Sequence, residues 1–424
     1  MKKIIGLSFL TAGFFLHAQN IGNSPYAAFG LGETQYDKNV EISAMGGIST
    51  AYISDINNSF NFENPANNKN LELTSFKLEA INENNFFKSN YNNSDITKHS
   101  TYLSNISLAF PLSQKVKFGI GYQPYSSKRY NMVISNTLSD GTIQAQSFRG
   151  EGTLNTLKAA VSYTIIPEFS LGLRANYYFG NLFDINELTY SNAELINGYE
   201  TKTIVKNFNF TLGANYQKTF WNDRKLTIGA TTTLGNTNDM KSEYLNSTYF
   251  YNSKGDKSYE SIIEQKVDQS KNLIPMEMSL GAGYGHANKW FVGSQMDFKK
   301  GEQILFYGKP FAYQDSYRFA AGGWILPNYN NFRNYLSRVI YRFGAYYEKG
   351  NLRINDKNIN SFAITAGASL PFKNNSINKM SSIDLGLEIG KRGTVQNELV
   401  SQTFVNLKIG INFADKWFGK KLYY

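Results

Sequence analysis

The stretch from residue 169 to residue 180 reads FSLGLRANYYFG, and apolar side chains alternate in it with small, polar or charged ones. The apolar set is Phe169, Leu171, Leu173, Ala175, Tyr177 and Phe179. Successive side chains of a β-strand point to opposite faces of the sheet, so this period of two predicts a strand with one apolar face. The opposite face would carry Gly, Ser, Asn and Arg174.

The same alternation recurs from about residue 71 to residue 413, for example over 116–122, 278–284 and 383–389. We expect strands at about residues 71–81, 99–110, 115–125, 153–165, 168–180, 203–219, 224–235, 277–286, 289–298, 315–325, 337–349, 359–371, 382–391 and 401–413. These are about fourteen strands, an even number such as a closed antiparallel barrel requires.

Three features favour a membrane barrel over a soluble β-sandwich, which would also show alternation. The segments approach the roughly 9 to 11 residues of a tilted transmembrane strand. Aromatic residues gather at segment ends, as at Trp290 and Phe291. Short connections alternate with long ones: those at 111–114, 166–167, 220–223 and 287–288 are short, and those at 82–98, 126–152, 181–202, 236–276 and 299–314 are long. Short periplasmic turns opposite long extracellular loops are typical of outer-membrane barrels, so we predict an all-β, transmembrane antiparallel β-barrel.

The composition excludes several other classes. The 424 residues include no cysteine and only three histidines, so neither a disulfide framework nor a thiolate metal site can form. The net charge is +10, but no block of basic residues occurs, and we expect no nucleic-acid partner. After the first sixteen residues no apolar run approaches the roughly 18 of a membrane-spanning helix. Neither His99 nor His286 belongs to a nucleophile motif, so we expect no catalytic residue, no enzyme activity, no metal and no cofactor.

The chain divides into four predicted parts. Residues 1–18 have the basic start, apolar segment and small final residue of a signal peptide, which places the mature protein in the outer membrane of a Gram-negative bacterium. Residues 71–413 would form the barrel and residues 414–424 a periplasmic tail. A barrel of about fourteen strands has a lumen too wide for its own side chains to fill. We therefore expect residues 19–70, which lack alternation, to be an N-terminal luminal plug; the alternative is a disordered periplasmic arm.

Motifs in the predicted plug carry a family resemblance. The stretch 43–52, SAMGGISTAY, is followed at 64–66 by NPA. Both resemble the N-terminal signature of the FadL-like outer-membrane family, whose members transport long-chain fatty acids and other hydrophobic compounds. The stretches 24–32 and 386–393 resemble a Bacteroidota branch of that family. The resemblance implies a fourteen-stranded barrel enclosing a hatch, to which six motif residues would belong: Met45, Gly46, Gly47, Asn64, Pro65 and Ala66.

A further match lies at residues 118–125, FGIGYQPY. It resembles the third strand of the family, where an inward kink opens a lateral gap in the wall. The residues concerned are Gly119, Gly121, Pro124 and Tyr125. Proline cannot donate to a strand ladder and glycine weakens a strand, so a kink is one expectation. The other is that Pro124 simply ends the strand at the membrane interface.

Placing the apolar faces outward puts six basic residues inside the lumen: Lys158, Arg174, Arg318, Arg338, Arg342 and Lys408. The acids Asp384 and Glu388 would also point inward. The arginines could bind a ligand carboxylate with two parallel hydrogen bonds. They could equally pair with acids of the plug and hold it in place; the candidate acids are Glu33, Asp37, Glu41 and Asp55.

Two functions follow from these observations. The resemblance implies a passive transporter of long-chain fatty acids or other hydrophobic compounds, whose partners are the lipid bilayer and a hydrophobic ligand. The alternative is a non-transporting barrel subunit of an outer-membrane protein complex, in protein secretion or barrel assembly. The loops 126–152 and 236–276 are rich in Tyr, Ser and Asn, which suits protein contacts as well as pore shielding, and we expect a hairpin extension at 254–271. A continuous apolar path would favour transport, and a hatch sealed by polar contacts would favour the subunit.

Overall fold

The structure, a computed structural model, describes residues 22–34, 38–90, 94–301, 303–306, 309–331, 333–372 and 381–417. The predicted signal peptide, Asp37, most of the turn expected at 372–381 and most of the predicted tail lie outside the described residues.

The described strands are β1 (Glu33–Thr34), β2 (Thr74–Ser89), β3 (Ser94–Pro111), β4 (Val116–Ser127), β5 (Tyr130–Thr137), β6 (Ile143–Ile166), β7 (Phe169–Tyr190), β8 (Ile196–Thr219), β9 (Arg224–Thr233), β10 (Asn236–Tyr251), β11 (Lys257–Ile274), β12 (Glu277–His286), β13 (Trp290–Lys299), β14 (Gln303–Phe306), β15 (Lys309–Ala312), β16 (Ser316–Ile325), β17 (Ile340–Lys349), β18 (Arg353–Ile354), β19 (Lys357–Asn358), β20 (Ser361–Pro371), β21 (Ser382–Gly393) and β22 (Val400–Asp415). The described helical elements are α2 (Val40–Ser43) and the 3-10 turns η2 (Pro25–Ala28), η3 (Pro65–Asn68), η4 (Trp221–Asp223), η5 (Tyr335–Arg338) and η6 (Gln396–Glu398).

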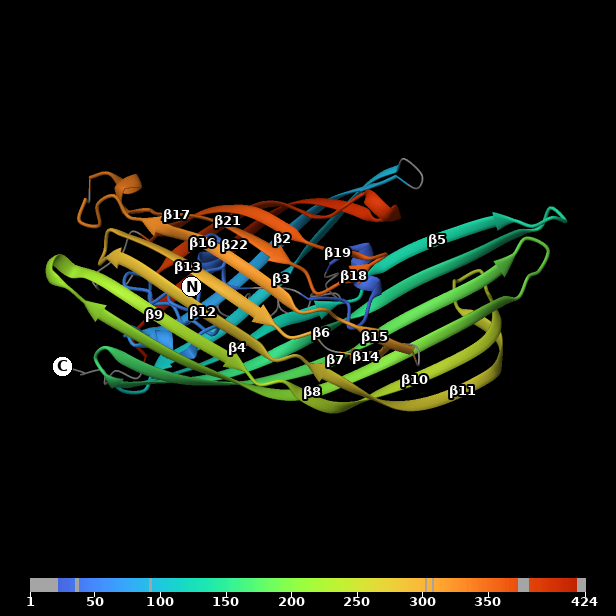
Figure 1. Cartoon of the computed structure of the whole chain (residues 1–424), viewed down its shortest axis with the longest axis horizontal. Coiled ribbons are helices and arrows are strands. Elements are labelled where there is room, and N and C mark those ends of the chain that lie inside the picture. The colour runs from blue at the N-terminus through green and yellow to red at the C-terminus, as the bar shows by residue number, and fades with distance from the viewer. Residues whose placement is uncertain are drawn as a thin grey trace, which may run out of the picture.

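Fourteen strands form one closed antiparallel barrel, which confirms the predicted fold class (Figure 1). They are β2–β4, β6–β9, β12, β13, β16, β17 and β20–β22. The wall closes where β2 pairs with β22 along the whole 16 residues of β2, from Thr74 opposite Asp415 to Ser89 opposite Val400. Closure pairs the backbone groups that hydrocarbon could not satisfy. Among the residues that the structure describes, no helix is long and apolar enough to span a membrane.

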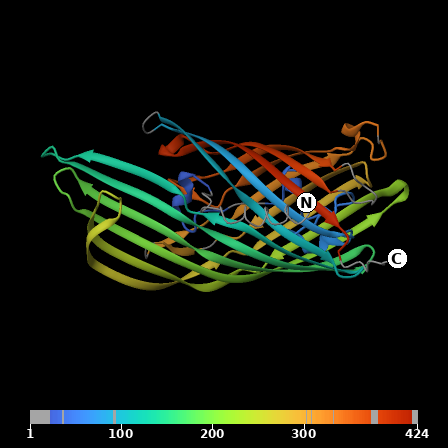
Figure 2. The same cartoon turned by 180° about the vertical axis from the view of Figure 1, so that it is seen from behind.

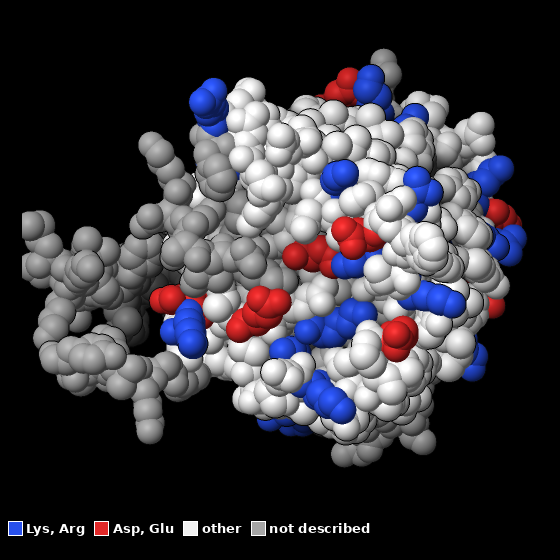
Figure 3. All heavy atoms as spheres, turned by 90° about the vertical axis from the view of Figure 1, so that its left-hand side faces the viewer, with Lys and Arg blue, Asp and Glu red and all other residues white. Residues whose placement is uncertain are grey.

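Each strand of the wall faces lipid on one side and the lumen on the other, which explains why apolar and polar residues alternate along it. Along β7 the outward Leu171 and Leu173 are 41% and 44% exposed, whereas the intervening Arg174 is 7% exposed and points inward. At the periplasmic end the strands are joined by short turns, including those between β6 and β7 and between β12 and β13. Figure 3 looks onto this end, where lysine and arginine are interspersed with aspartate and glutamate on the described surface.

Many strands are longer than the sequence pattern indicates, which corrects several predicted boundaries. β6, β7 and β8 have 24, 22 and 24 residues, against the roughly 9 to 11 that cross a bilayer. Lipid imposes the apolar alternation, so the pattern fades where the wall continues into water. Much of the long connections expected at 126–152, 181–202 and 236–276 is therefore strand. In the last of these, β10 and β11 form a hairpin that extends the sheet beyond β8; the stretch 254–271, where we expect a hairpin, is only part of its turn and most of its second arm.

One predicted strand begins later than expected. The strand predicted at 337–349 starts at Ile340, and the preceding residues form the 3-10 turn η5. The side chain of Asn334 accepts a hydrogen bond from Leu336 N and so caps this turn. Arg338 consequently lies in the turn, at the periplasmic rim, and not on the strand.

The hatch, defined here as residues 22–34 and 38–70, lies inside the barrel and contains little regular structure. Its apolar side chains Ile42, Met45 and Ile48 pack with Trp324 and Ile340 of the wall. Its backbone is satisfied largely by side-chain amides because few of its main-chain groups belong to helices or strands. Five buried asparagines supply hydrogen bonds to main-chain groups of residues 49–73: Asn58, Asn61, Asn64, Asn67 and Asn68.

Candidate functional site

The Met45–Gly47 segment presses the hatch backbone against the wall. Gly46 N donates to Thr365 Oγ1 at 2.8 Å, and Arg318 Nη2 donates to Gly46 O at 2.7 Å. Gly46 and Gly47 have φ values of +68° and +83°, which favour glycine. A Cβ atom on Gly46 would stand 2.8 Å from the carbonyl oxygen of Ala345, so the turn also needs glycine for its close approach to β17.

The Asn64–Ala66 motif fixes the end of the hatch to the opposite wall. Asn64 Nδ2 donates to Thr50 O at 2.7 Å and to Ala214 O of β8 at 3.3 Å. Its Oδ1 accepts from Ala66 N at 3.1 Å and caps η3. The wall makes room for this turn with Gly172, where a Cβ atom would overlap the backbone of Pro65 and Ala66.

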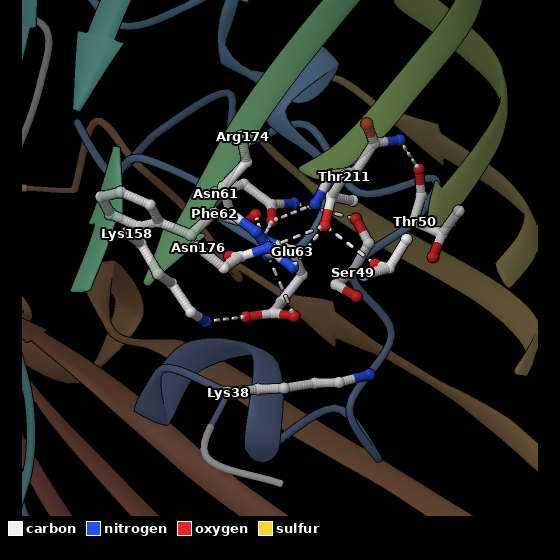
Figure 4. Close-up of polar contacts among 12 residues, drawn as sticks. Lys38, Ser49, Thr50, Asn61, Phe62, Glu63, Lys158, Arg174, Asn176 and Thr211 are labelled. Carbon is white, nitrogen blue, oxygen red and sulfur yellow. Dashed lines mark hydrogen bonds and ion pairs between the residues drawn. The ribbon is translucent and has the colours of Figure 1, made fainter. Parts of the chain in front are cut away.

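Glu63 lies in the lumen between two of the predicted basic residues (Figure 4). Its carboxylate is 3.0 Å from Lys158 Nζ and 3.5 Å from Arg174 Nη1. Arg174 also donates to Phe62 O and, at 3.0 Å, to Thr211 Oγ1 of β8. The side chain of Lys38 reaches toward the same region, where its Nζ donates to Gly47 O at 2.7 Å. Two buried wall cations and one partly exposed hatch acid therefore form a latch.

A second latch joins Glu41 of α2 to Lys77 and Arg342 of the wall. Glu41 pairs with Lys77 Nζ, and Arg342 Nη2 is 3.4 Å from its other oxygen. All three side chains are at most 3% exposed. Arg342 also donates to Ser369, which in turn donates to Asp384, so a predicted inward acid completes the same network.

The remaining residues that we predict to point inward are Arg318, Arg338, Glu388 and Lys408. Arg318 pairs with Asp297 at 3.3 Å, and Lys408 pairs with Glu388 at 3.2 Å while donating to Ser43 of the hatch at 3.2 Å. Arg338 lies in η5, where its guanidinium carbon stands 5.6 Å from the ring centroid of Tyr335. Of the other hatch acids named as candidates, Glu33 pairs with Arg392 and Asp55 with Lys225.

Several residues of these contacts were not among the predicted site residues. Lys77, Asp297 and Arg392 lie on strands at inward positions, so the period-two pattern could have found them. Lys77, for example, stands between the outward Phe76 and Leu78. Glu63 had no such signal, because the hatch has no periodicity to say which of its side chains face the wall.

The two latches make hatch docking depend on pH. Burial alone would raise the pKa of Glu63, but Lys158 and Arg174 outweigh it and lower the pKa to about 2; the pKa of Glu41 is likewise lowered to about 2 by Lys77 and Arg342, against the effect of burial. An unfolded glutamate titrates near pH 4.3, so each depressed pKa stabilises the docked hatch above about pH 4.3, and this is lost as pH falls through about 2. The shift corresponds to about 3 kcal/mol for each carboxylate.

Trp324 provides the measurement, because it packs on the hatch and is 4% exposed. In a variant whose other tryptophans are replaced by phenylalanine, we expect its emission to shift to the red between pH 4 and pH 2. Adding Glu63→Gln removes one of the carboxylates that take up a proton, so the emission should change less steeply with pH. An unchanged pH profile in that variant would show that Glu63 does not titrate with hatch release.

The third barrel strand, β4, loses its pairing with β3 and shifts its register on β6 in the region where the sequence resemblance implies a kink. β3 and β4 pair only between Ile106 and Pro111 on β3, although both strands continue beyond. The register of β4 on β6 shifts between Pro124 and Ser126, so the intervening Tyr125 is a bulge residue, and its ring packs on Tyr178 at 4.7 Å. The wall is therefore split between β3 and β4 above the periplasmic half of the barrel.

The hatch lies against β4 both below the split and along it. Below the split, where β4 is still paired with β3, Phe60 and Phe62 lie against Gly119 and Gly121, and a Cβ atom on these glycines would stand 2.9 Å and 3.3 Å from the two rings. Farther up, β1 pairs with the end of β4, Glu33 opposite Ser127 and Thr34 opposite Ser126. One short hatch strand thus replaces β3 as the neighbour of β4.

The first part of the hatch also spans the extracellular mouth. Ser24 Oγ donates to Gln402 at 3.2 Å, and Tyr26 donates to Val400 O. On the other side of the mouth, Lys128 Nζ donates to Gly30 O at 3.0 Å and pairs with Asp184. The segment 22–34 is therefore tied to both the start of β22 and the β4–β5 junction.

A closed fourteen-stranded antiparallel barrel with an N-terminal segment in its lumen has the fold of the FadL-type outer-membrane barrels. Solved structures share this architecture at low sequence identity. The Pseudomonas aeruginosa FadL homologue has a TM-score of 0.61 at 12% identity, covering 90% of this chain and 98% of its own. The CymD monoaromatic hydrocarbon channel has a TM-score of 0.58 at 13% identity, covering 89% of this chain and 98% of its own. The Ralstonia pickettii toluene transporter TbuX has a TM-score of 0.56 at 15% identity, covering 89% of this chain and 99% of its own.

The sequence itself defines a narrower group. A model of the BamG family matches residues 1–424, and this chain belongs to the BamG family. A search of curated protein sequences finds no match to this chain.

Proposed function

We propose that this barrel is a non-transporting subunit of an outer-membrane protein complex that acts in protein secretion or barrel assembly. The observation that carries the proposal is the way the hatch is held. A fully buried ion pair fixes Glu41 to the wall, a partly exposed one fixes Glu63, and main-chain atoms of the hatch lie directly on wall glycines. Breaking a buried ion pair by removing one partner typically costs about 3 to 5 kcal/mol, so opening this lumen would be expensive.

Two cavities among the described residues of the lumen are lined by many charged groups, which also argues against a path for hydrophobic compounds. One cavity of about 170 Å³ is lined by charged residues that include Glu33, Arg318, Glu388, Arg392 and Lys408. A second, of about 90 Å³, is lined by Lys38, Glu63, Asp297 and other polar groups. Known ligand pockets are instead mostly apolar, with a few convergent polar groups.

The extracellular half of the molecule offers a large surface for protein contacts. The 24-residue strands β6 and β8 and the β10–β11 hairpin continue the sheet well beyond the length that a bilayer requires (Figure 1). This part of the wall offers area for contacts with a partner protein. The match of the whole chain to the BamG family supports this alternative over the one implied by the channels, which share only 12–15% identity.

Gentle detergent extraction of the tagged protein from its own outer membrane, followed by native mass spectrometry, tests the proposal. We expect a stoichiometric complex with other envelope proteins and no bound fatty acid on the barrel. The matched control is another tagged barrel of the same membrane, which should not bring the same partners. A monomeric barrel that carries a fatty acid would contradict the proposal.

Transport of a hydrophobic compound is the second candidate, and the split between β3 and β4 is the observation that favours it. Such a compound could leave the lumen sideways past Gly119, Gly121, Pro124 and Tyr125. The lumen cations would then serve a ligand carboxylate only after the hatch had released them, because Lys158, Arg174 and Arg342 are all engaged by hatch acids. Bound lipid in the same mass spectra would favour this function.

A further inference from the structure

β5 has an open edge along the upper part of the split. Among the described strands, β5 pairs with β6 alone, from Tyr130 opposite Gly150 to Thr137 opposite Ile143, and the turn η2 of the hatch lies near β5 without forming a strand ladder with it. β3, the strand that would lie on its other side, pairs with β2 and with the lower part of β4 only. Figures 1 and 2 both show the end of the β2–β3 hairpin diverging from β5 at the extracellular end. The two sides of the wall are therefore separate at this height.

This open edge lies outside the membrane. At about 3.3 Å per residue and a tilt of about 40°, a strand crosses the roughly 25 Å apolar band within about ten residues. Counted from Val116 at the periplasmic end of β4, the band ends near Tyr125, and all of β5 lies beyond it. The exposed side chains of Met132, Val133 and Ile134, which are 38%, 65% and 49% accessible, therefore face water and not lipid.

The hydrogen-bonding direction of each β5 residue follows from the ladder with β6. Lys128 N donates to Gly152 O and Leu138 N donates to Thr142 O, so the even-numbered residues face β6. Residues of an antiparallel pair alternate between hydrogen-bonded and non-hydrogen-bonded positions. The main-chain N–H and C=O groups of Asn131, Val133, Ser135 and Thr137 therefore point to the open side.

The edge lacks the features that protect sheet edges. Natural edge strands carry lysine, proline, an inward charge or a bulge that prevents pairing with another chain. Residues 130–138, YNMVISNTL, contain no charged residue and no proline. An unprotected edge with exposed apolar residues on both faces would be an aggregation hazard unless another strand covers it.

We propose that the open edge of β5 receives an extended segment of a partner protein as an additional strand. The occupant must be polypeptide, because only an extended chain presents donors and acceptors at the spacing of the four odd-numbered residues. Since the edge is uncharged, the partner segment is recognised by main-chain pairing and by apolar side chains that cover Val133 and its neighbours. This inference rests on the proposed function, since it names the place at which the complex is held together.

A proline substitution separates this edge from the rest of the fold. Ser135→Pro removes a donor from the open side and keeps the ladder with β6, because proline is tolerated on edge strands where its missing N–H faces solvent. Ser135→Ala is the matched control, since it changes the side chain alone. We expect Ser135→Pro to lower the yield of the complex at least tenfold, and Ser135→Ala to leave it unchanged. Both barrels should show the gel mobility of the folded wild type.

Amide hydrogen exchange on the purified complex and on the barrel separated from it gives a direct readout. We expect the amides of Val133 and Ser135 to exchange at least tenfold more slowly in the complex, and the amide of Ile134 to be protected in both. Equal exchange in the two states, or a Ser135→Pro complex of normal yield, would overturn the inference while leaving the proposed function intact. A complex whose second chain is another copy of this barrel would overturn the choice of partner. Absence of any complex with the wild type would count against the proposed function itself.

Discussion

A Gly344→Val variant is expected to insert as a barrel whose hatch has left its docked position. Gly344 faces the hatch, and a Cβ atom there would overlap the main-chain atoms Gly46 N and Met45 C. Because both colliding groups are backbone, a side-chain rotation cannot relieve the overlap, and we expect a loss of about 3 kcal/mol or more in hatch docking. Protease cleavage within residues 38–70, in barrels inserted in liposomes, is the measurement.

The neighbouring Ala345 provides the control for this variant. It is exposed on the outer face of the same strand, so Ala345→Val adds the same bulk toward lipid and should leave the hatch resistant to protease. A resistant hatch in Gly344→Val would mean that the wall at β17 can move away, and that the contact between glycine and hatch backbone is not a constraint.

The second large effect is expected from Glu41→Gln. This change leaves Lys77 and Arg342 buried without their counter-charge, and the loss of one partner from such a group typically costs about 3 to 5 kcal/mol. Replacing all three residues by apolar ones of similar size, with Glu41→Leu, Lys77→Met and Arg342→Met, should restore most of the stability, because neither cation is then left unpaired and the remaining acid of the network, Asp384, keeps its hydrogen bonds from Ser369 and Ser382.

Hatch stability in both variants can be followed by the emission of Trp324 during urea titration. We expect the hatch transition of Glu41→Gln at a much lower urea concentration than in the wild type, and that of the triple variant close to the wild type. A triple variant no more stable than Glu41→Gln would indicate that apolar packing cannot replace the latch, and that its hydrogen bonds to Ser369 matter more than its charges.

The barrel itself could be predicted because lipid acts on every membrane-spanning segment in the same way. The apolar positions of β7, such as Leu171 and Leu173, are the outward ones in the structure, and the strand count follows from repeated use of that rule. The extensions into water could not be predicted in the same way. The upper part of β8 alternates little, and its strand character comes from pairing with β7 and β10.

The lumen contacts were open to prediction on one side only. The period-two alternation of the strands identifies Arg174 and Arg342 as lumen residues. Their partners lie on the hatch, whose sequence shows no such alternation. Glu41 was among the acids considered, and Glu63, the partner of both Lys158 and Arg174, was not. The bulge at Tyr125, beside the split, could not be predicted from the sequence, because Pro124 could equally have ended the strand there.

The most direct test of a fixed hatch uses a disulfide lock, because the chain has no cysteine of its own. A Cβ atom on Gly281 would stand 3.3 Å from the Cβ of Ala51, close to the separation in disulfides, so Ala51→Cys with Gly281→Cys should join hatch and wall. The uptake of a fluorescent fatty acid is then measured in liposomes that contain the wild type, the locked variant or no protein. If the hatch is fixed, fatty-acid uptake should be equally slow in all three kinds of liposome. Faster uptake with the wild type, abolished by the lock and restored by a reductant, would contradict a fixed hatch.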